Sequence, residues 1–220
     1  QSSFVDGLRV TDAATVEVVE MVLAGKINKE IVTAIQAAGG KAVGISGKDG
    51  RLIEAVKLTR TRKDPDSNIE QVVDLGFVGE PQRINTSLLD VFMGTDIIPV
   101  IAPVGVGVDQ ETYNINADTV ANGVAVALHA RALVLISDVP AVLRDITDPA
   151  SRIARMTATD AKAAMESGVV TKGMVPKLEE AFAAIDAGVS RVLIVGKLRP
   201  GDLRRAVDEP GSVGTELVKG

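Results

Sequence analysis

Apolar and polar residues form separate blocks along the chain, and three successive blocks between residues 97 and 130 are the clearest. Residues 97–103 are almost continuously apolar. Residues 104–118 carry two glycines together with amide and acidic side chains, whereas 119–130 are rich in Ala and Val and have no acidic residue. Because continuous apolar runs are typical of elements that are covered on both faces, the pattern predicts a buried strand, a polar loop and a buried helix.

The first forty residues contain a long stripe of apolar residues at helical spacing. Apolar positions recur every three or four residues between Val16 and Ile35, and Gly25 interrupts them. This spacing predicts one long helix that is capped by Thr11, kinked or broken near Gly25, and ended by the glycine pair at 39–40.

Shorter blocks predict the remaining strands and helices. The expected buried strands are 41–46, 133–136, 192–195 and, as a final edge strand, 213–217. The expected helices are 86–93, 157–167 with Thr157 as its cap, 174–185 and 202–207, and a hairpin is expected to join 52–58 to 72–78. Strands that alternate with helices are typical of an α/β fold with a mainly parallel sheet, which is the fold that we predict.

Composition excludes several kinds of partner and chemistry. The 220 residues are 46% hydrophobic but only 2% aromatic, which excludes aromatic platforms for single-stranded nucleic acid. The net charge of −5 argues against any phosphate-backbone partner. The lack of cysteine excludes thiolate catalysis, and a single histidine argues against a metal site. No apolar run approaches a membrane span and no signal peptide is visible, so we expect a soluble, cytoplasmic protein without a membrane partner.

The polar block at 104–118 holds the first candidate site. Asn114, Asn116 and Asp118 are spaced two apart, just before the expected helix. In open α/β sheets, ligands bind in loops at the carboxyl ends of strands. Side chains at a spacing of two point the same way from extended backbone, so the two amides could together bind a polar ligand. For Asp118 alone, the local pattern favours an N-cap, whose carboxylate accepts hydrogen bonds from the first N–H groups of a helix.

Six motifs, found in the same order, resemble those of the acetylglutamate kinases of the amino-acid kinase superfamily. One is Tyr-Asn-Ile-Asn-Ala-Asp at 113–118, preceded by Pro-Val-Ile-Ala-Pro-Val-Gly at 99–105. The other five lie at 4–12, 24–29, 46–50, 74–80 and 173–177. The resemblance extends over nearly all 220 residues, and six motifs in order are a far stronger signal than any one of them.

The resemblance implies a three-layer α/β sandwich with a mainly parallel central sheet. It implies a lobe at 1–130 for the acylated amino acid and dimerisation, and a nucleotide-binding lobe at 131–220. The implied reaction transfers the γ-phosphoryl group of ATP, bound with Mg²⁺, to the side-chain carboxylate of N-acetyl-L-glutamate in arginine biosynthesis. Two alternatives stay open: a kinase for another acylated or carrier-linked amino acid of the aminoadipate type, and a non-catalytic ligand-binding fragment.

Four residues match substrate-binding or catalytic positions of the family. From its local sequence Arg9 is a surface arginine, but the resemblance implies that its guanidinium binds the substrate α-carboxylate, and that Asn114 also binds the substrate. Lys177 lies in the first turns of an expected helix, where a cation opposes the helix dipole. A solvated lysine can tolerate that small cost, whereas the resemblance implies that Lys177 stabilises the transferring phosphoryl group and that Asp118 orients the catalytic lysines.

Two further stretches match the family's ATP-binding segments. The first follows the strand expected at 133–136, where α/β sheets bind nucleotides, although an ordinary turn between a strand and a helix would look much the same. The residues implied are Asp138, Val139, Pro140, Ala141, Val142, Leu143, Val169, Val170 and Thr171.

The chain departs from the family at both ends. The family's opening strand and its glycine-rich phosphate loop precede the first motif, and we expect both to be missing from this sequence. Many arginine-inhibited members carry a His after the Pro of the last helix motif, whereas Gly201 follows Pro200 here, so arginine feedback is in doubt. The resemblance implies a homodimer and leaves open whether dimers join into a hexamer.

Overall fold

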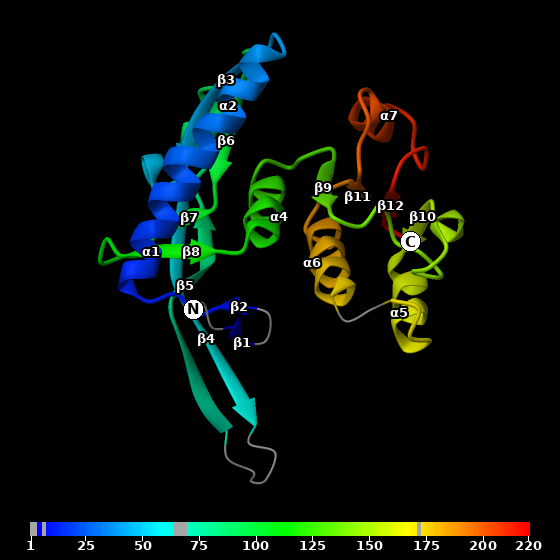
Figure 1. Ribbon diagram of the computed structural model, residues 1–220, viewed down its shortest axis with the longest axis horizontal. Coiled ribbons are helices and arrows are strands. Elements are labelled where there is room, and N and C mark those ends of the chain that lie inside the picture. Colours follow the sequence, from blue (N-terminus) through cyan, green and yellow to red (C-terminus); the bar gives the residue numbers. More distant parts are fainter. Residues whose placement is uncertain (1–3, 6–7, 64–69, 171–172) are drawn as a thin grey trace. The chain divides into compact units, whose positions relative to one another are not determined.

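The computed structural model describes residues 4–5, 8–63, 70–170 and 173–220. The packing of the chain divides it into two compact units, Gln1–Val120 and Ala121–Gly220 (Figure 1). The boundary lies inside α4 (Ala117–Ala127), whereas the two lobes expected from the sequence meet after this helix. The functional assignment of the lobes stays a prediction.

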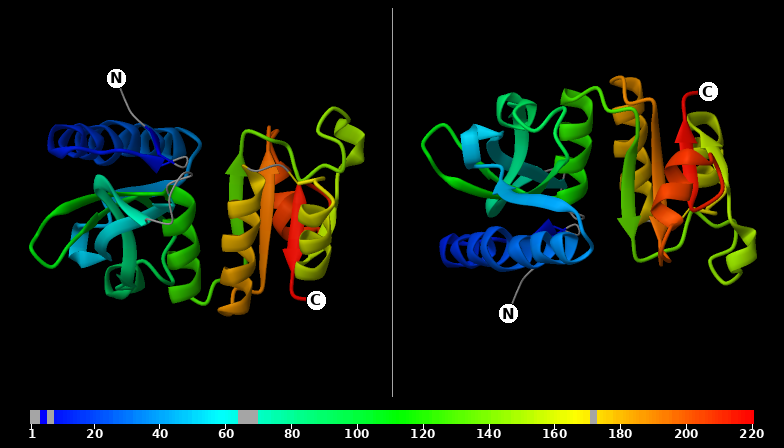
Figure 2. Two further views of the ribbon diagram at one scale, coloured as in Figure 1. Left: turned by 90° about the horizontal axis from the view of Figure 1, so that it is seen from below. Right: turned by 90° about the horizontal axis from the view of Figure 1, so that it is seen from above.

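The first unit begins with the predicted long helix. It consists of α1 (Ala13–Glu20), a π-helical segment η1 (Met21–Ile27) and α2 (Asn28–Ala37), which form one continuous rod in Figure 2. The irregularity expected near Gly25, a kink or a break, is a π-helical widening in a continuous helix, so the alternative of a break is wrong. A short strand pair, β1 (Phe4–Val5) and β2 (Leu8–Arg9), precedes the rod.

Thr11 does not cap this helix, so that prediction is wrong. The N-cap is Asp12, whose carboxylate accepts a 2.7 Å hydrogen bond from the backbone N–H of Thr15. Thr11 is fully buried, and its backbone bonds to Leu75 and Phe77 as a strand residue does. The helix begins at Ala13, so the capping position falls on Asp12 rather than on Thr11.

A buried amide fastens the helical rod to a parallel pair of strands, β3 (Lys41–Ser46) and β6 (Ile97–Ala102). Asn28 is 2% exposed and donates hydrogen bonds to the carbonyls of Ile45 and Val100, one on each strand. A Cβ at Gly44 would overlap the Asn28 side-chain oxygen, so only glycine allows this close approach.

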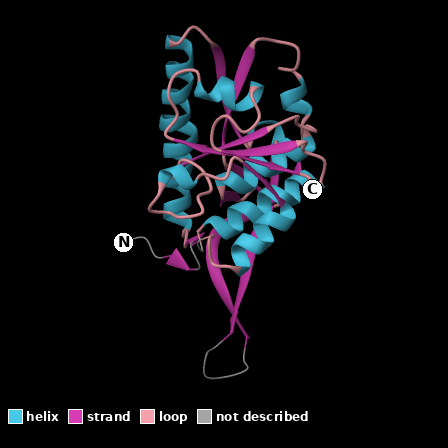
Figure 3. Ribbon diagram, turned by 90° about the vertical axis from the view of Figure 1, so that its right-hand side faces the viewer, coloured by secondary structure: helices cyan, strands magenta, loops and turns pink. Residues whose placement is uncertain are grey.

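The rest of the first unit is a small closed barrel. Its strands are β4 (Ile53–Lys63), β5 (Glu70–Ile84), β7 (Val104–Val106) and β8 (Thr112–Ile115). Two short elements flank the β4–β5 pair in sequence: η2 (Asp49–Arg51) precedes β4, and α3 (Ser87–Asp90) follows β5. The predicted hairpin is confirmed as the antiparallel pair β4–β5, seen as a long ribbon in Figure 3.

The polar loop predicted at 104–118 is wrong, because β7 and β8 pair there as an antiparallel hairpin. Val104, Val106, Tyr113 and Ile115 are all buried in the barrel. On β8, Tyr113 and Ile115 alternate with the half-buried Thr112 and Asn114, a period of two that indicates a strand, whereas all three residues of β7 are buried. The glycines and charged residues between them obscured this short pattern.

The second unit is built on one four-stranded sheet in the order β10-β12-β11-β9. The strands are β9 (Leu133–Ser137), β10 (Arg155–Thr157), β11 (Arg191–Gly196) and β12 (Thr215–Val218). β9–β11 and β10–β12 are parallel, and β11–β12 is antiparallel. β12 is therefore an inner strand and not the edge strand predicted, because β10 pairs along its outer side.

Helices cover both faces of this sheet. On one face Val192, Ile194 and Leu217 pack against Leu178 and Ile185 of α6 (Met174–Asp186), and α5 (Ala158–Glu166) lies on the same side. On the other face Leu193 and Val195 pack against Ala206 of α7 (Asp202–Asp208). Figure 1 shows α7 above the sheet and α5 and α6 below it, so the predicted α/β class and three-layer arrangement are confirmed.

Candidate functional site

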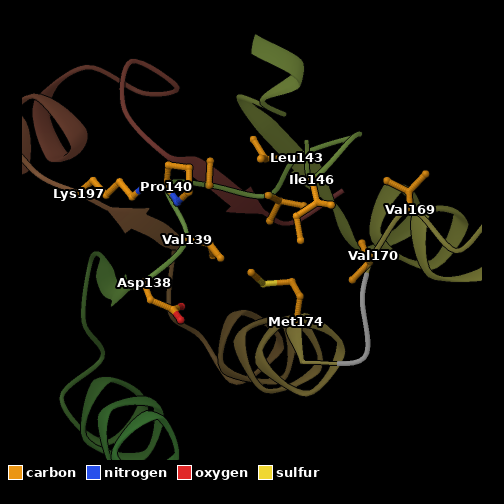
Figure 4. Close-up of a pocket in the computed structure, with 11 residues that line it drawn as sticks. Asp138, Val139, Pro140, Leu143, Ile146, Val169, Val170, Met174 and Lys197 are labelled. Carbon is orange, nitrogen blue, oxygen red and sulfur yellow. The ribbon is translucent and has the colours of Figure 1, made fainter. Parts of the chain in front are cut away.

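A pocket of about 210 Å³ lies beside the carboxyl end of β9 in the second unit (Figure 4). Its wall contains all eight of the described residues that were predicted to bind nucleotide. These are Asp138, Val139, Pro140, Ala141, Val142, Leu143, Val169 and Val170; Thr171, the ninth, lies outside the described residues. The structure thus brings two segments, 26 residues apart in sequence, to one hollow.

The parallel pair β9–β11 sets the position of this loop. Gly196 ends β11 and lies opposite Ser137, the last residue of β9. A Cβ at Gly196 would overlap the carbonyl oxygens of Ser137 and Val139, so the loop can cross the end of β11 only because this residue is glycine. The far part of the loop is held by Thr215, whose buried hydroxyl accepts a 2.9 Å hydrogen bond from the N–H of Val142.

Three lining residues were missed by the sequence analysis: Ile146, Met174 and Lys197. Met174 is the first residue of α6, and its side chain extends into the pocket in Figure 4. Lys197 directly follows β11, and the carboxyl end of a strong parallel strand is the signal that could have located it. Ile146 follows no such element, and only the folded loop brings it to the pocket.

Lys177 lies one turn after Met174 on α6 and is half-buried. Residues at i and i+3 are neighbours on a helix surface, so Lys177 is adjacent to the wall of the pocket. Asp118 lies in the first turn of α4 and belongs to the first unit. Each of the two predicted catalytic residues is therefore placed within its own unit.

Asp118 is not the N-cap of α4, contrary to the local pattern. Asn116 takes that place: its side-chain oxygen accepts hydrogen bonds from the N–H groups of Asp118 (2.9 Å) and Thr119 (3.2 Å). An amide caps a helix about as well as a carboxylate, and Asn116 directly precedes the first helical residue. The prediction that Asn114 and Asn116 together bind a ligand is less well supported, because the side chain of Asn116 already caps the helix.

Asn114 lies on β8, half-buried, between β7 and β5. Its amide nitrogen is 3.5 Å from the hydroxyl oxygen of Thr11, which itself bridges to Gly76 of β5. Arg9 is two residues before Thr11, on β2, and its side chain lies outside the described part of the chain. The structure therefore brings the segment that carries Arg9 next to Asn114 in the barrel of the first unit.

The neighbour of Asn114 on β8 is a strongly perturbed acid. Tyr113 is buried, and this burial, together with a 2.8 Å hydrogen bond to the carboxylate of Glu111, raises the pKa of its hydroxyl to about 12. The phenol therefore stays neutral and takes no part in acid–base chemistry near neutral pH.

No group of three His, Asp or Glu residues able to hold a metal ion occurs in the ranges that the structure describes. Among the same residues, no helix is both long and apolar enough to cross a bilayer.

The helix-covered sheet and the pocket at its strand ends define an α/β protein with a ligand site of the kind that nucleotides use. Residues 1–196 match the model of the amino acid kinase family, and the chain belongs to this family.

Within the family, the chain is similar to proteins named acetylglutamate kinase. It is 51% identical over 216 residues to the one from Rhodospirillum centenum, covering 98% of this chain and 70% of that protein. It is 53% identical over 206 residues to the one from Caulobacter vibrioides NA1000, covering 91% and 67%.

Solved structures share the fold. The crystal structure of smu.665 from Streptococcus mutans UA159 matches with a TM-score of 0.75 and 27% identity, over 99% of this chain and 77% of that one. N-acetylglutamate synthase from Neisseria gonorrhoeae, complexed with coenzyme A and N-acetyl-glutamate, matches with a TM-score of 0.78 and 23% identity, over 100% of this chain and 47% of that one.

Proposed function

We infer that this protein phosphorylates N-acetyl-L-glutamate with ATP, a step of arginine biosynthesis. The observation that carries the inference is 51% identity, over 98% of the chain, to a protein named acetylglutamate kinase. In this reaction an oxygen of the side-chain carboxylate attacks the γ-phosphorus, the bond from that phosphorus to the ADP oxygen breaks, and an acyl phosphate and ADP result. Such a transfer depends on positioning and on neutralising the charge of the phosphoryl group.

We propose that the pocket in the second unit holds the adenosine part of ATP. Most of its wall consists of apolar side chains from the loop after β9, from Val169 and Val170, and from Met174. A flat, uncharged base suits such a surface, because apolar pockets with a few polar groups bind this kind of ligand.

We propose that Mg²⁺ enters as its complex with ATP and neutralises phosphate charge. The ion is usually bound by substrate phosphates, waters and one or two carboxylates, so it requires no preformed cluster of protein ligands. The residues present are compatible with this arrangement.

The catalytic and substrate-binding roles are likewise proposals. Lys177 would stabilise the transferring phosphoryl group, which its place next to Met174 supports. Asp118 would orient the catalytic lysines of the family. Arg9 and Asn114 would bind acetylglutamate, which is supported by the contact between Asn114 and the segment that follows Arg9.

The direct test is an assay of ADP release with hydroxylamine trapping of the acyl phosphate. N-acetyl-L-glutamate should be turned over and trapped as its hydroxamate, whereas glutamate and an acetylated aminoadipate should give little product. Turnover of the aminoadipate derivative without turnover of acetylglutamate would overturn the proposed substrate. Binding of ATP and acetylglutamate without any ADP release would indicate a ligand-binding protein instead.

We also propose a homodimer, formed in the cytoplasm through the helical rod. Large apolar side chains are exposed along it, including Val18 (52%), Met21 (63%) and Ile31 (45%). Exposed apolar surface of this kind marks protein interfaces. Light scattering at micromolar concentration should give twice the chain mass, and Met21→Lys should shift it towards the monomer. A monomer in the wild type contradicts this proposal.

A further inference from the structure

The two ends of the pocket differ in charge. Val169, Val170 and Ile146 lie at one end in Figure 4, and Asp138 and Lys197 lie at the other. Of the described residues that line the pocket, Lys197 is the one with a positive charge. No described carboxylate forms an ion pair with it, so within this part of the chain its ammonium group is available to an anion.

The backbone of Lys197 adopts a conformation that its side chain disfavours. Its φ angle is +51°, in the left-handed region that glycine occupies most readily. A residue other than glycine in this region costs free energy, and such outliers gather at functional sites, where the surrounding structure holds them. A glycine at this position would relieve the strain. The chain has a lysine there instead, and this lysine lines the pocket, which indicates a function for its side chain.

We propose that Lys197 is a nucleotide-binding residue whose ammonium group contacts the phosphate chain of ATP. This inference rests on the proposed function, because it takes the occupant of the pocket to be a nucleotide. The base is uncharged and suits the apolar end. The phosphates are anionic and suit Lys197, the one cation among the described lining residues, at the end that also carries the Asp138 carboxylate. A lysine ammonium binds phosphate as a compact point charge with three donors.

The strength of the contact follows from the exposure of Lys197, which lies at the surface of the unit. Exposed ion pairs are individually weak, because water and salt screen them. We therefore expect Lys197→Ala to weaken ATP binding roughly two- to fivefold. The affinity for adenosine, which has no phosphate, should stay unchanged.

Calorimetry on the whole chain, with MgATP and with adenosine as separate ligands, tests this expectation. Lys197→Arg should retain most of the ATP affinity, and the difference between wild type and Lys197→Ala should shrink as salt is added, because salt screens exposed charges. Equal losses of ATP and adenosine affinity would mean that Lys197 shapes the pocket, and would overturn the proposal.

His129 provides a matched control for the backbone. It is exposed, has a φ angle of +50°, lies in the same unit and does not line the pocket. Because both glycine substitutions relieve a similar strain, Lys197→Gly and His129→Gly should each raise the melting temperature. Only Lys197→Gly should lose ATP affinity, to the extent that Lys197→Ala does.

The outcomes separate this inference from the proposed function. A wild-type chain that binds ATP, with the same affinity in Lys197→Ala, overturns the role of Lys197 alone. A wild-type chain that binds neither ATP nor adenosine overturns both.

Discussion

The two units present their candidate binding groups by different means. In the second unit, a backbone loop at the end of β9 and the start of α6 form a pocket with mostly apolar walls. In the first unit, the candidate groups are polar side chains on barrel strands, and Asn114 lies against Thr11. The packing of apolar side chains can form a pocket in the absence of ligand. Polar side chains that would bind a polar ligand instead form hydrogen bonds with one another when no ligand is bound. The following four predictions test this difference.

The largest effect is expected at Lys177, in the second unit. Lys177→Met should lower kcat for acetylglutamate phosphorylation roughly 100- to 1000-fold, as loss of a donor aimed at transition-state charge typically does. Its KM values should change little, because an interaction made mainly in the transition state does not contribute to ground-state binding. Steady-state kinetics measures both.

The matched control is Lys162→Met on α5, an exposed lysine of the same unit that does not line the pocket. It should leave kcat unchanged. A Lys177→Met enzyme with near-normal kcat would make Lys177 a solvated helix residue.

Substitution of one glycine in each unit should affect ligand binding in that unit alone. A Cβ at Gly196 would overlap the carbonyl of Val139 in the second unit, and a Cβ at Gly76, where φ is +71°, would overlap the carbonyl of Thr11 in the first. Each Gly→Ala change should lower the free energy of unfolding by about 1–3 kcal/mol, the usual cost of forcing extra atoms into a packed site. Denaturant titration measures this loss.

Ligand binding then shows which unit each glycine serves. Gly196→Ala should weaken ATP binding and leave acetylglutamate binding intact, and Gly76→Ala should do the reverse. Gly25 has no heavy atom within 4 Å of an added Cβ, so Gly25→Ala should leave both affinities unchanged. Loss of both ligands in either of the first two variants would mean that the units do not bind independently.

A smaller effect is expected at the cap of α5. Thr157 and Asp160 form a capping box, and Thr157→Ala should cost about 1 kcal/mol of stability. The backbone N–H and the hydroxyl of Thr157 hold the pKa of Asp160 below its ordinary value of 3.8.

The cap should also make stability depend on pH in acid. A carboxylate whose pKa is lower in the folded state stabilises the fold fully above pH 3.8, and this contribution is lost as the pH falls through the lower folded value. The stability difference between wild type and Thr157→Ala should therefore narrow at low pH. A difference that stays constant down to pH 2 would contradict the contribution of the carboxylate.

The ionisation of Tyr113, in the first unit, is expected to have the smallest effect on stability near neutral pH. It is the single tyrosine of a chain without tryptophan, so tyrosinate absorbance reports on this residue alone. Its hydroxyl should ionise near pH 12 in the folded protein, because burial and Glu111 raise its pKa. Between pH 10 and 12 the unfolded chain loses its proton first, so stability should fall as the pH rises.

Glu111→Gln removes the carboxylate that, together with burial, raises the pKa of Tyr113. The pKa should then fall but stay above 10, because burial is the larger cause. A tyrosine that ionises at pH 10 in the folded wild type would mean that β8 is open to solvent.

Much of the fold could be predicted from periodicity. The helix over the first forty residues, the β4–β5 hairpin and the strands β9 and β11 are long, strongly patterned elements, and the structure has all of them. Short elements were missed or misplaced: the sequence pattern predicted a loop where the structure has β7 and β8, and it predicted an edge strand for β12, which is an inner strand. A strand of three or four residues carries too few alternating positions to show against glycines and charges.

The sequence by itself determined the class of fold, the family and the two segments that line the pocket, because local propensity and motif order are properties of neighbouring residues. Tertiary structure decided the rest. Asn116 rather than Asp118 caps α4, and Asn28 is buried, with its amide bonded to two strands. Lys197 reaches the pocket because β11 ends beside β9. Each of these positions depends on residues that are distant in sequence and that form a hydrogen bond with the side chain or complete the wall of the pocket. Those residues come together only when the chain folds.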